Sequence, residues 1–160
     1  YKVTGVQTCA LPICFLGGDD RALDDRQKAG LRTFVANGCG ACHSGPLLGG
    51  TSLQPFGLAR PYWEETGSTK VDPGLFAATK KEEDRFVFRV PMLRNVAKTA
   101  PYFHDGSVAT LAQAVRVMGR VQLGSELDDG EVAAIVDFLG ALTGPVPPNY
   151  APPGQSARAE

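Results

Sequence analysis

The chain has 160 residues, a length that favours one domain built around one hydrophobic core. Its 16 Lys and Arg residues nearly balance 17 Asp and Glu residues, without a long run of either sign, so we expect no nucleic-acid partner and no polybasic membrane surface. Its apolar runs are too short for a membrane-spanning helix, which needs roughly 18 apolar residues, so no transmembrane segment is expected.

The two ends of the chain are expected to lie outside this domain. The opening YKVTGVQTCALPIC resembles translated sequencing-adapter read-through and shows no recognisable signal peptide. We interpret residues 1–21 as a non-native or disordered leader and assign no function to Cys9 or Cys14. Residues 145–160 are rich in Pro and small polar residues, which predicts a tail without a core of its own. The domain is therefore expected to span residues 22–144.

The first predicted helix covers residues 24–37. Its apolar residues Leu31, Phe34 and Val35 fall on one helical face, which predicts the buried side. Gly38 follows directly and can adopt the left-handed conformation that ends a helix. The helix is therefore expected to end immediately before a cysteine pair.

The residues from Cys39 to His43 read CGACH, which is a CxxCH pattern. Two thiols at this spacing can bond to the two vinyl groups of one haem, and the following imidazole then lies beneath the iron. A thioredoxin-like redox pair and half of a zinc site also use CxxC. However, a helix rather than a strand precedes Cys39, and a zinc site would need a second pair of ligands. We predict one covalent haem c, attached to Cys39 and Cys42 and bound through iron by His43.

Residues 44–100 show no sustained helical periodicity. A brief alternation at Phe86, Phe88 and Val90 predicts one short strand. So long an irregular segment is unusual in a compact domain unless it surrounds a ligand that replaces missing core. A haem, which is large, flat and mostly apolar, would fill this role. We therefore predict an all-α, cytochrome c-like domain with long haem-wrapping loops.

A second helix is predicted over residues 110–119. Thr110 and Gln113 form a capping-box pattern at its start. The residues that share its apolar face are Leu111, Ala114, Val115 and Met118. We expect Met118 to point toward the packed side of this helix.

A third helix has the strongest signals in the chain. Asp128 and Glu131 repeat the capping-box pattern at its start, and Gly144 and Pro145 mark its end. Its apolar residues at helical spacing are Val132, Ile135, Val136, Leu139 and Leu142. This helix is therefore expected to contribute one face to the core.

A sixth ligand of the iron is expected from Met92, Met118 or His104, which are the remaining Met and His residues of the chain. A Met thioether favours ferrous iron and raises the reduction potential, whereas a second His would lower it. A Met can equally well serve only as core packing. Spacing alone does not choose among the three.

Three segments resemble the C-terminal haem domain of the bacterial di-haem cytochrome c peroxidases. They read GCGACHSGPLLGG, VPMLRNVAKTAPYFHDGSVATLAQAVRVM and LDDGEVAAIVDFLGALTG. The resemblance extends from about Arg26 to Gly144, and LRNVAKTAPYFHDGS is its most characteristic part. In that family this domain holds the high-potential, electron-accepting haem, whose Met ligand lies in the helix after YFHDGS. The resemblance therefore implies Met118, and a Met at this position favours the peroxidases over their maturase relatives, which have Tyr there.

The resemblance also implies a function and partners. A small cytochrome c or copper protein would reduce this haem, which would pass the electron to a peroxidatic haem in an N-terminal domain that this chain does not contain. Hydrogen peroxide would be reduced to water there, so the isolated domain is expected to transfer electrons without peroxidase activity. A homodimer is implied in the same way, whereas a periplasmic location is expected because c-type haem is attached on the outer side of the bacterial inner membrane. The alternative is a stand-alone mono-haem electron carrier.

Other residues have a structural interpretation beside a functional one. The resemblance implies that backbone oxygens of Thr99 and Pro101 face a calcium ion shared with the N-terminal domain, where the alternative is an ordinary loop. Guanidinium groups suit haem propionates, so Arg89 and Arg94 are candidates, although structural pairing explains them equally well. His104 is interpreted as a structural or haem-edge residue in a turn with Asp105 and Gly106.

Overall fold

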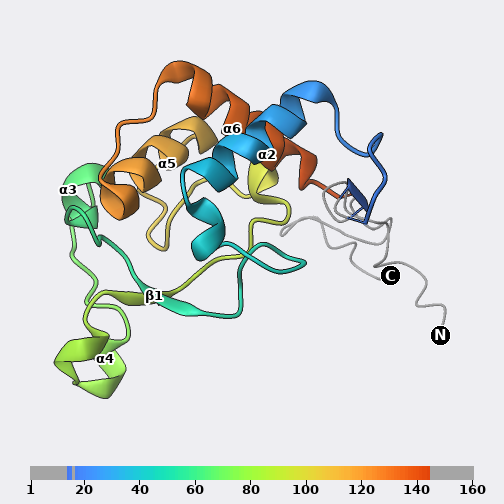
Figure 1. Ribbon diagram of the computed structural model, residues 1–160. Helices are drawn as coiled ribbons and strands as arrows, with labels where there is room; N and C mark the ends of the chain where they lie inside the picture. Colours follow the sequence, from blue (N-terminus) through green and yellow to red (C-terminus); the bar gives the residue numbers. More distant parts are fainter. Residues whose placement is uncertain (1–13, 16, 145–160) are drawn as a thin grey trace, which may run out of the picture.

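Three helices gather on one side of the molecule, whose computed structural model describes residues 14–15 and 17–144 (Figure 1). They are α2 (Asp25–Ala36), α5 (Leu111–Met118) and α6 (Asp129–Ala141). Loops, a small hairpin and two short helices extend from their other side. The tail predicted over residues 145–160 and most of the leader predicted over residues 1–21 lie outside the described residues.

The segment between α2 and α5 contains only short elements. The strands are β1 (Leu53–Pro55) and β2 (Val87–Arg89), and the short helices are α3 (Tyr62–Thr66) and α4 (Phe76–Thr79). Turns of 3-10 type in this segment cover Cys39–Ala41, Glu82–Asp84 and Val96–Lys98. A π turn over Gly119–Leu123 follows α5 directly. The strand predicted around Phe88 is confirmed as β2, which pairs antiparallel with β1. The described fold is thus helix-rich, as predicted, but the two-stranded sheet means that it is not purely α-helical.

Helix α2 begins at a complete capping box. The Asp24 carboxylate accepts the backbone N–H of Gln27 at 2.8 Å, and the Gln27 side chain accepts the N–H of Asp24 at 3.1 Å. Gly38 has φ 80°, which confirms the left-handed residue that ends the helix. The predicted buried face was wrong at Val35, which is 61 % exposed. Gly30 and Phe34, four residues apart, face the neighbouring helix instead, and Val35 is turned about 100° away from Phe34.

The capping signals of the two later helices have different outcomes. At α6 both halves of the box form, because Asp128 accepts the N–H of Glu131 at 2.8 Å and Glu131 accepts that of Asp128 at 3.0 Å. At α5 only one half forms. Thr110 accepts the N–H of Gln113 at 3.2 Å, but the Gln113 side chain accepts the Thr110 hydroxyl instead of its backbone N–H.

Buried side chains form two apolar clusters that meet at α5. The helical cluster joins α2, α5 and α6, and its buried members are Phe34, Leu93, Val115, Leu127, Val132, Ile135, Phe138, Leu139 and Leu142. The aromatic cluster joins α5 to the irregular segment, and its buried members are Tyr62, Tyr102, Val108, Ala114, Val117 and Val121. Partly buried residues that complete the aromatic cluster include Phe56, Trp63, Phe86, Phe88, Phe103 and Met118. The packing predicted for Met118 is thus confirmed.

Gly30 allows α2 to approach α6 closely. A Cβ atom at Gly30 would lie 1.9 Å from the carbonyl oxygen of Ala134 and 2.8 Å from Cβ of Phe138. Ala favours a helix over Gly by about 1 kcal/mol, but overlap with backbone atoms outweighs this gain. We expect Gly30→Ala to lower the free energy of unfolding by about 1–3 kcal/mol, as measured by denaturant titration.

Gly140→Ala is the matched control for this prediction. Gly140 is an exposed residue of α6, and a Cβ atom there would meet no neighbour within 4 Å. This variant should be as stable as the wild type or slightly more stable, because only helix propensity changes. Equal stability of the two variants would contradict the close approach at Gly30.

Candidate functional site

The two cysteines of the CxxCH pattern lie in one tight turn. Gly38 ends α2, and the chain passes directly into the 3-10 turn that starts at Cys39. The N–H of His43 donates to the carbonyl of Cys39 at 3.0 Å, which closes the turn. Cys39 and Cys42 are both free thiols and both half-buried. The helix and turn therefore present two thiols and an imidazole together.

The surroundings of Cys39 do not suit the other uses of a CxxC pair. Burial raises the pKa of the Cys39 thiol, more than a backbone hydrogen bond lowers it. A redox-active cysteine needs the opposite shift, toward a reactive thiolate at neutral pH. Within residues 14–15 and 17–144, no group of three or more His, Cys, Asp or Glu side chains is placed to hold a metal ion. Neither the redox pair nor the zinc site gains support.

The ring of His43 is oriented by backbone carbonyls. Its Nδ1 atom lies 3.3 Å from the carbonyl oxygen of Leu48, a contact that requires the hydrogen on Nδ1. Burial lowers the pKa of His43, and hydrogen bonding to the carbonyls of Leu48 and Pro91 partly offsets this shift. A neutral ring with hydrogen on Nδ1 leaves the Nε2 lone pair available, which is the form that binds iron.

A double glycine lies beside the Nδ1 edge of this ring, with Gly49 next to the ring and Gly50 next to Met92. Gly49 has φ 123°, and a Cβ atom there would lie 2.3 Å from the carbonyl oxygen of Pro91 and 3.4 Å from Nδ1 of His43. A Cβ atom at Gly50 would lie 2.6 Å from Cγ of Met92. The Gly50 carbonyl accepts hydrogen bonds from both Nε and Nη2 of Arg89, at 2.8 and 2.5 Å. Arg89 therefore has the structural pairing that the sequence left open.

The three candidates for a sixth ligand lie in different surroundings. Met92 is 51 % exposed and contacts Gly50, next to the glycine that lines the His43 ring. Met118 is half-buried at the end of α5, in the aromatic cluster. His104 is exposed in a turn, where its ring stacks on Phe88 at 4.6 Å and meets Tyr62 edge-on at 5.4 Å. Met92 thus lies near Gly50, next to the glycine beside the His43 ring, whereas Met118 and His104 lie with residues of the aromatic cluster.

These residues fit one covalently attached haem. Two free thiols share one turn, an imidazole offers Nε2, and a thioether lies on a separate element. Exposed apolar side chains also flank this turn, because Leu47 is 38 % exposed and Met92 is 51 % exposed. An apolar macrocycle would cover such surface, and its burial contributes about 25 cal/mol per Å².

Sequence reasoning missed one polar residue near Met118. Gln122 follows α5 in the π turn, and its side chain bonds to backbone atoms of residues 55–58.

The residues predicted for calcium, Thr99 and Pro101, lie in an exposed stretch between the 3-10 turn Val96–Lys98 and Tyr102. That ion stays a prediction.

Comparison with known proteins gives a consistent set of relatives. The chain is 49 % identical over 133 residues to a cytochrome c551 peroxidase of Pseudomonas aeruginosa, covering 83 % of this chain and 38 % of that protein. It is 47 % identical to a cytochrome c551 peroxidase of Nitrosomonas europaea, covering 83 % and 39 %. It thus spans less than two fifths of either relative. No family model matches the chain.

A solved structure with a similar fold is also found. It is described as a MauG-like protein associated with microbial copper homeostasis, with a TM-score of 0.65 and 25 % sequence identity. The similarity covers 83 % of this chain and 47 % of that one. Across the residues that the structure describes, no helix has both the length and the apolar character needed to cross a membrane.

Proposed function

Because the chain belongs to the cytochrome c peroxidase family, we propose that it is the electron-transferring haem domain of a di-haem peroxidase. Cys39 and Cys42 would hold one haem c through thioether bonds, and His43 and Met118 would bind its iron. The observation that carries this proposal is the CxxCH turn, in which the Leu48 carbonyl holds the His43 ring with Nε2 free. When bound, the haem supplies a one-electron ferric–ferrous couple.

In this proposal, residues of the chain set the reduction potential of this couple and keep peroxide from the iron. His43 stays neutral because burial disfavours its protonated form, so the ring keeps the lone pair needed for the iron. A Met118 thioether on the iron would favour the ferrous state and raise the reduction potential, as suits an acceptor of electrons from a small redox protein. With both His43 and Met118 bound to the iron, no position would remain open for peroxide. Electron transfer is therefore the role of this domain, and peroxide is reduced elsewhere.

Further properties of the whole protein follow as proposals. The electron would pass to a peroxidatic haem in a preceding domain, where hydrogen peroxide is reduced to water. The donor would be a small cytochrome c or copper protein, and the location would be the periplasm, where c-type haem is attached. Backbone oxygens of Thr99 and Pro101 would contribute to a calcium site at the domain junction, and the parent protein would form a homodimer.

The proposal is tested by producing the chain together with a cytochrome c maturation system. We expect haem that stays bound after denaturation, a low-spin absorbance spectrum in the reduced state and electron uptake from a small reduced cytochrome. We also expect no turnover of peroxide. A folded but colourless protein would exclude the haem, and peroxide turnover by the chain alone would exclude the division of labour between domains.

A further inference from the structure

A π turn follows Met118 directly. It covers Gly119–Leu123, and the N–H of Gly124 donates to the carbonyl of Gly119, five residues back. Turns of this kind are rare, occur mostly as single turns at the ends of or within α-helices, and are frequent at functional sites. The backbone stays helical from α5 through the π turn and ends at Gly124, which has φ 65°, so Met118 lies in the last turns of one continuous helical stretch. The ends of such stretches open more readily than their middles. Contacts that anchor the π turn therefore also restrain Met118.

The side chain of Gln122 provides such an anchor. Its Oε1 accepts the N–H of Gly57 at 2.6 Å and that of Leu58 at 3.4 Å. Its Nε2 donates to the carbonyl of Pro55 at 3.1 Å. The Gln122 side chain is half-buried. Its oxygen and its nitrogen both form hydrogen bonds with the backbone of a loop that lies 65 residues earlier in the sequence.

Backbone bonds extend the same contact. The carbonyl of Val121 accepts the N–H of Ala59 at 2.8 Å and that of Arg60 at 3.4 Å. Phe56, which lies within this loop, belongs to the aromatic cluster that Met118 also joins. The loop over residues 55–60 is therefore held against the π turn and, through Phe56, belongs to the same apolar cluster as Met118.

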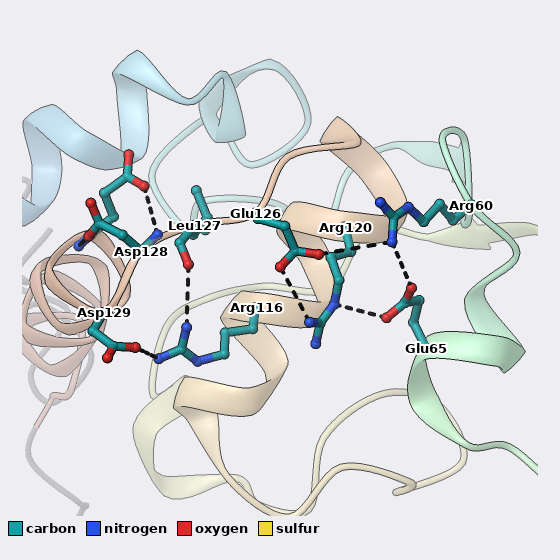
Figure 2. A network of polar contacts seen from close by, with 9 residues as sticks. Arg60, Glu65, Arg116, Arg120, Glu126, Leu127, Asp128 and Asp129 are labelled. Atoms are coloured by element: carbon teal, nitrogen blue, oxygen red, sulfur yellow. Dashed lines mark hydrogen bonds and ion pairs between the residues drawn. The ribbon is translucent and has the colours of Figure 1, made fainter.

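An ion-pair network covers the outer side of the same turn (Figure 2). Arg120 places Nε 2.8 Å from the Glu65 carboxylate of α3 and Nη1 3.4 Å from Glu126. Arg60 meets Glu65 at 3.2 Å. Glu126 is 64 % exposed, so solvent screens its pair with Arg120, whereas the pair between Arg120 (29 % exposed) and Glu65 (21 % exposed) is partly shielded. The amide of Gln122 joins the π turn directly to the backbone of residues 55–58.

We propose that Gln122 is a positioning residue for Met118. By fixing the π turn to the loop over residues 55–60, it keeps the end of this helical stretch from opening and so would hold the thioether at the iron. This inference rests on the proposed function, in which Met118 is the axial ligand. Without the amide, the sulfur–iron bond competes with local opening of the helix end, and other ligands reach the iron more often.

The test uses the haem-loaded chain with Gln122→Ala and, as a control, Gln113→Ala. Gln113 is an exposed glutamine at the other end of α5, and its side chain accepts the Thr110 hydroxyl rather than bonding to the loop over residues 55–60. The readouts are the long-wavelength sulfur-to-iron charge-transfer band of the ferric protein and the affinity for added imidazole. We expect Gln122→Ala to weaken the band and to bind imidazole about tenfold more tightly, equivalent to ~1.4 kcal/mol, the scale of one net hydrogen bond. Gln113→Ala should match the wild type.

The outcomes separate this inference from the proposed function. A wild-type protein without the band, whose spectrum Met118→Ala leaves unchanged, would reject Met118 as ligand. A wild-type band that Gln122→Ala leaves intact, with unchanged imidazole affinity, would overturn the role of Gln122 alone.

If Gln122→Ala does not fold, Gln122→Glu decides the question. A protonated Glu keeps both the acceptor and the donor, whereas a carboxylate loses the donor and faces the carbonyl of Pro55. The band of this variant should therefore weaken as the pH rises, relative to the wild type at the same pH. A band that equals the wild-type band at every pH would overturn the inference.

Discussion

The double variant Cys39→Ser, Cys42→Ser is expected to accumulate without haem. A serine hydroxyl does not form the thioether bond that a thiol forms with a haem vinyl group, and no other described residue offers a free thiol at this turn. Serine has nearly the size of cysteine, so the 3-10 turn can keep its shape. Haem staining after denaturing electrophoresis should fall to background, and the absorbance of the purified protein should fall with it.

Single variants and a neighbouring control define this result further. Cys39→Ser and Cys42→Ser should each retain one thioether bond and an intermediate haem content. Ser44→Ala changes an exposed residue beside His43 and should leave haem attachment at the wild-type level. Haem that resists denaturation in the double variant would place the attachment outside the CxxCH pattern. Loss of haem in Ser44→Ala would point to a general folding defect.

Sequence patterns predicted the elements whose signals are local. The capping boxes at Asp24 and Asp128 act across three residues, so the sequence contains the whole interaction. The burial of Gly30 in place of Val35 depends on where α6 approaches, which no pattern within α2 reveals. Strand β1 was missed because three residues, one of them a proline, carry too little periodicity.

The candidate site likewise combines local features, which the sequence predicts, with contacts between distant residues, which it does not. The CxxCH pattern specifies the chemistry of Cys39, Cys42 and His43 within five residues. The contact of Gln122 with Gly57 joins residues 65 positions apart, and a glutamine after a helix has many other uses. The position of Met92 beside Gly50 also depends on distant loops that meet only in the fold. Local chemistry was therefore predictable, and the groups that orient it were not.

Met118→Ala is expected to open the sixth position of the iron. The alanine methyl group has no donor atom, so the sulfur-to-iron charge-transfer band should disappear and the ferric spectrum should shift toward high spin. The reduction potential should fall by on the order of 0.1 V, within the ~0.8 V range that axial ligands span. Spectroscopy of the ferric protein and a redox titration measure both effects, and added imidazole should bind at least about tenfold more tightly.

Two further variants distinguish ligation from packing. Met118→His should keep a six-coordinate, low-spin iron but lower the potential, because a second imidazole replaces the thioether. Met92→Ala removes a thioether that is 51 % exposed and lies beside Gly50, next to the residue that lines the His43 ring, and should leave the band unchanged. If Met92→Ala abolished the band while Met118→Ala preserved it, Met92 would be the ligand. If neither variant changed the spectrum, His104 would be the remaining candidate, and His104→Ala would have to open the site.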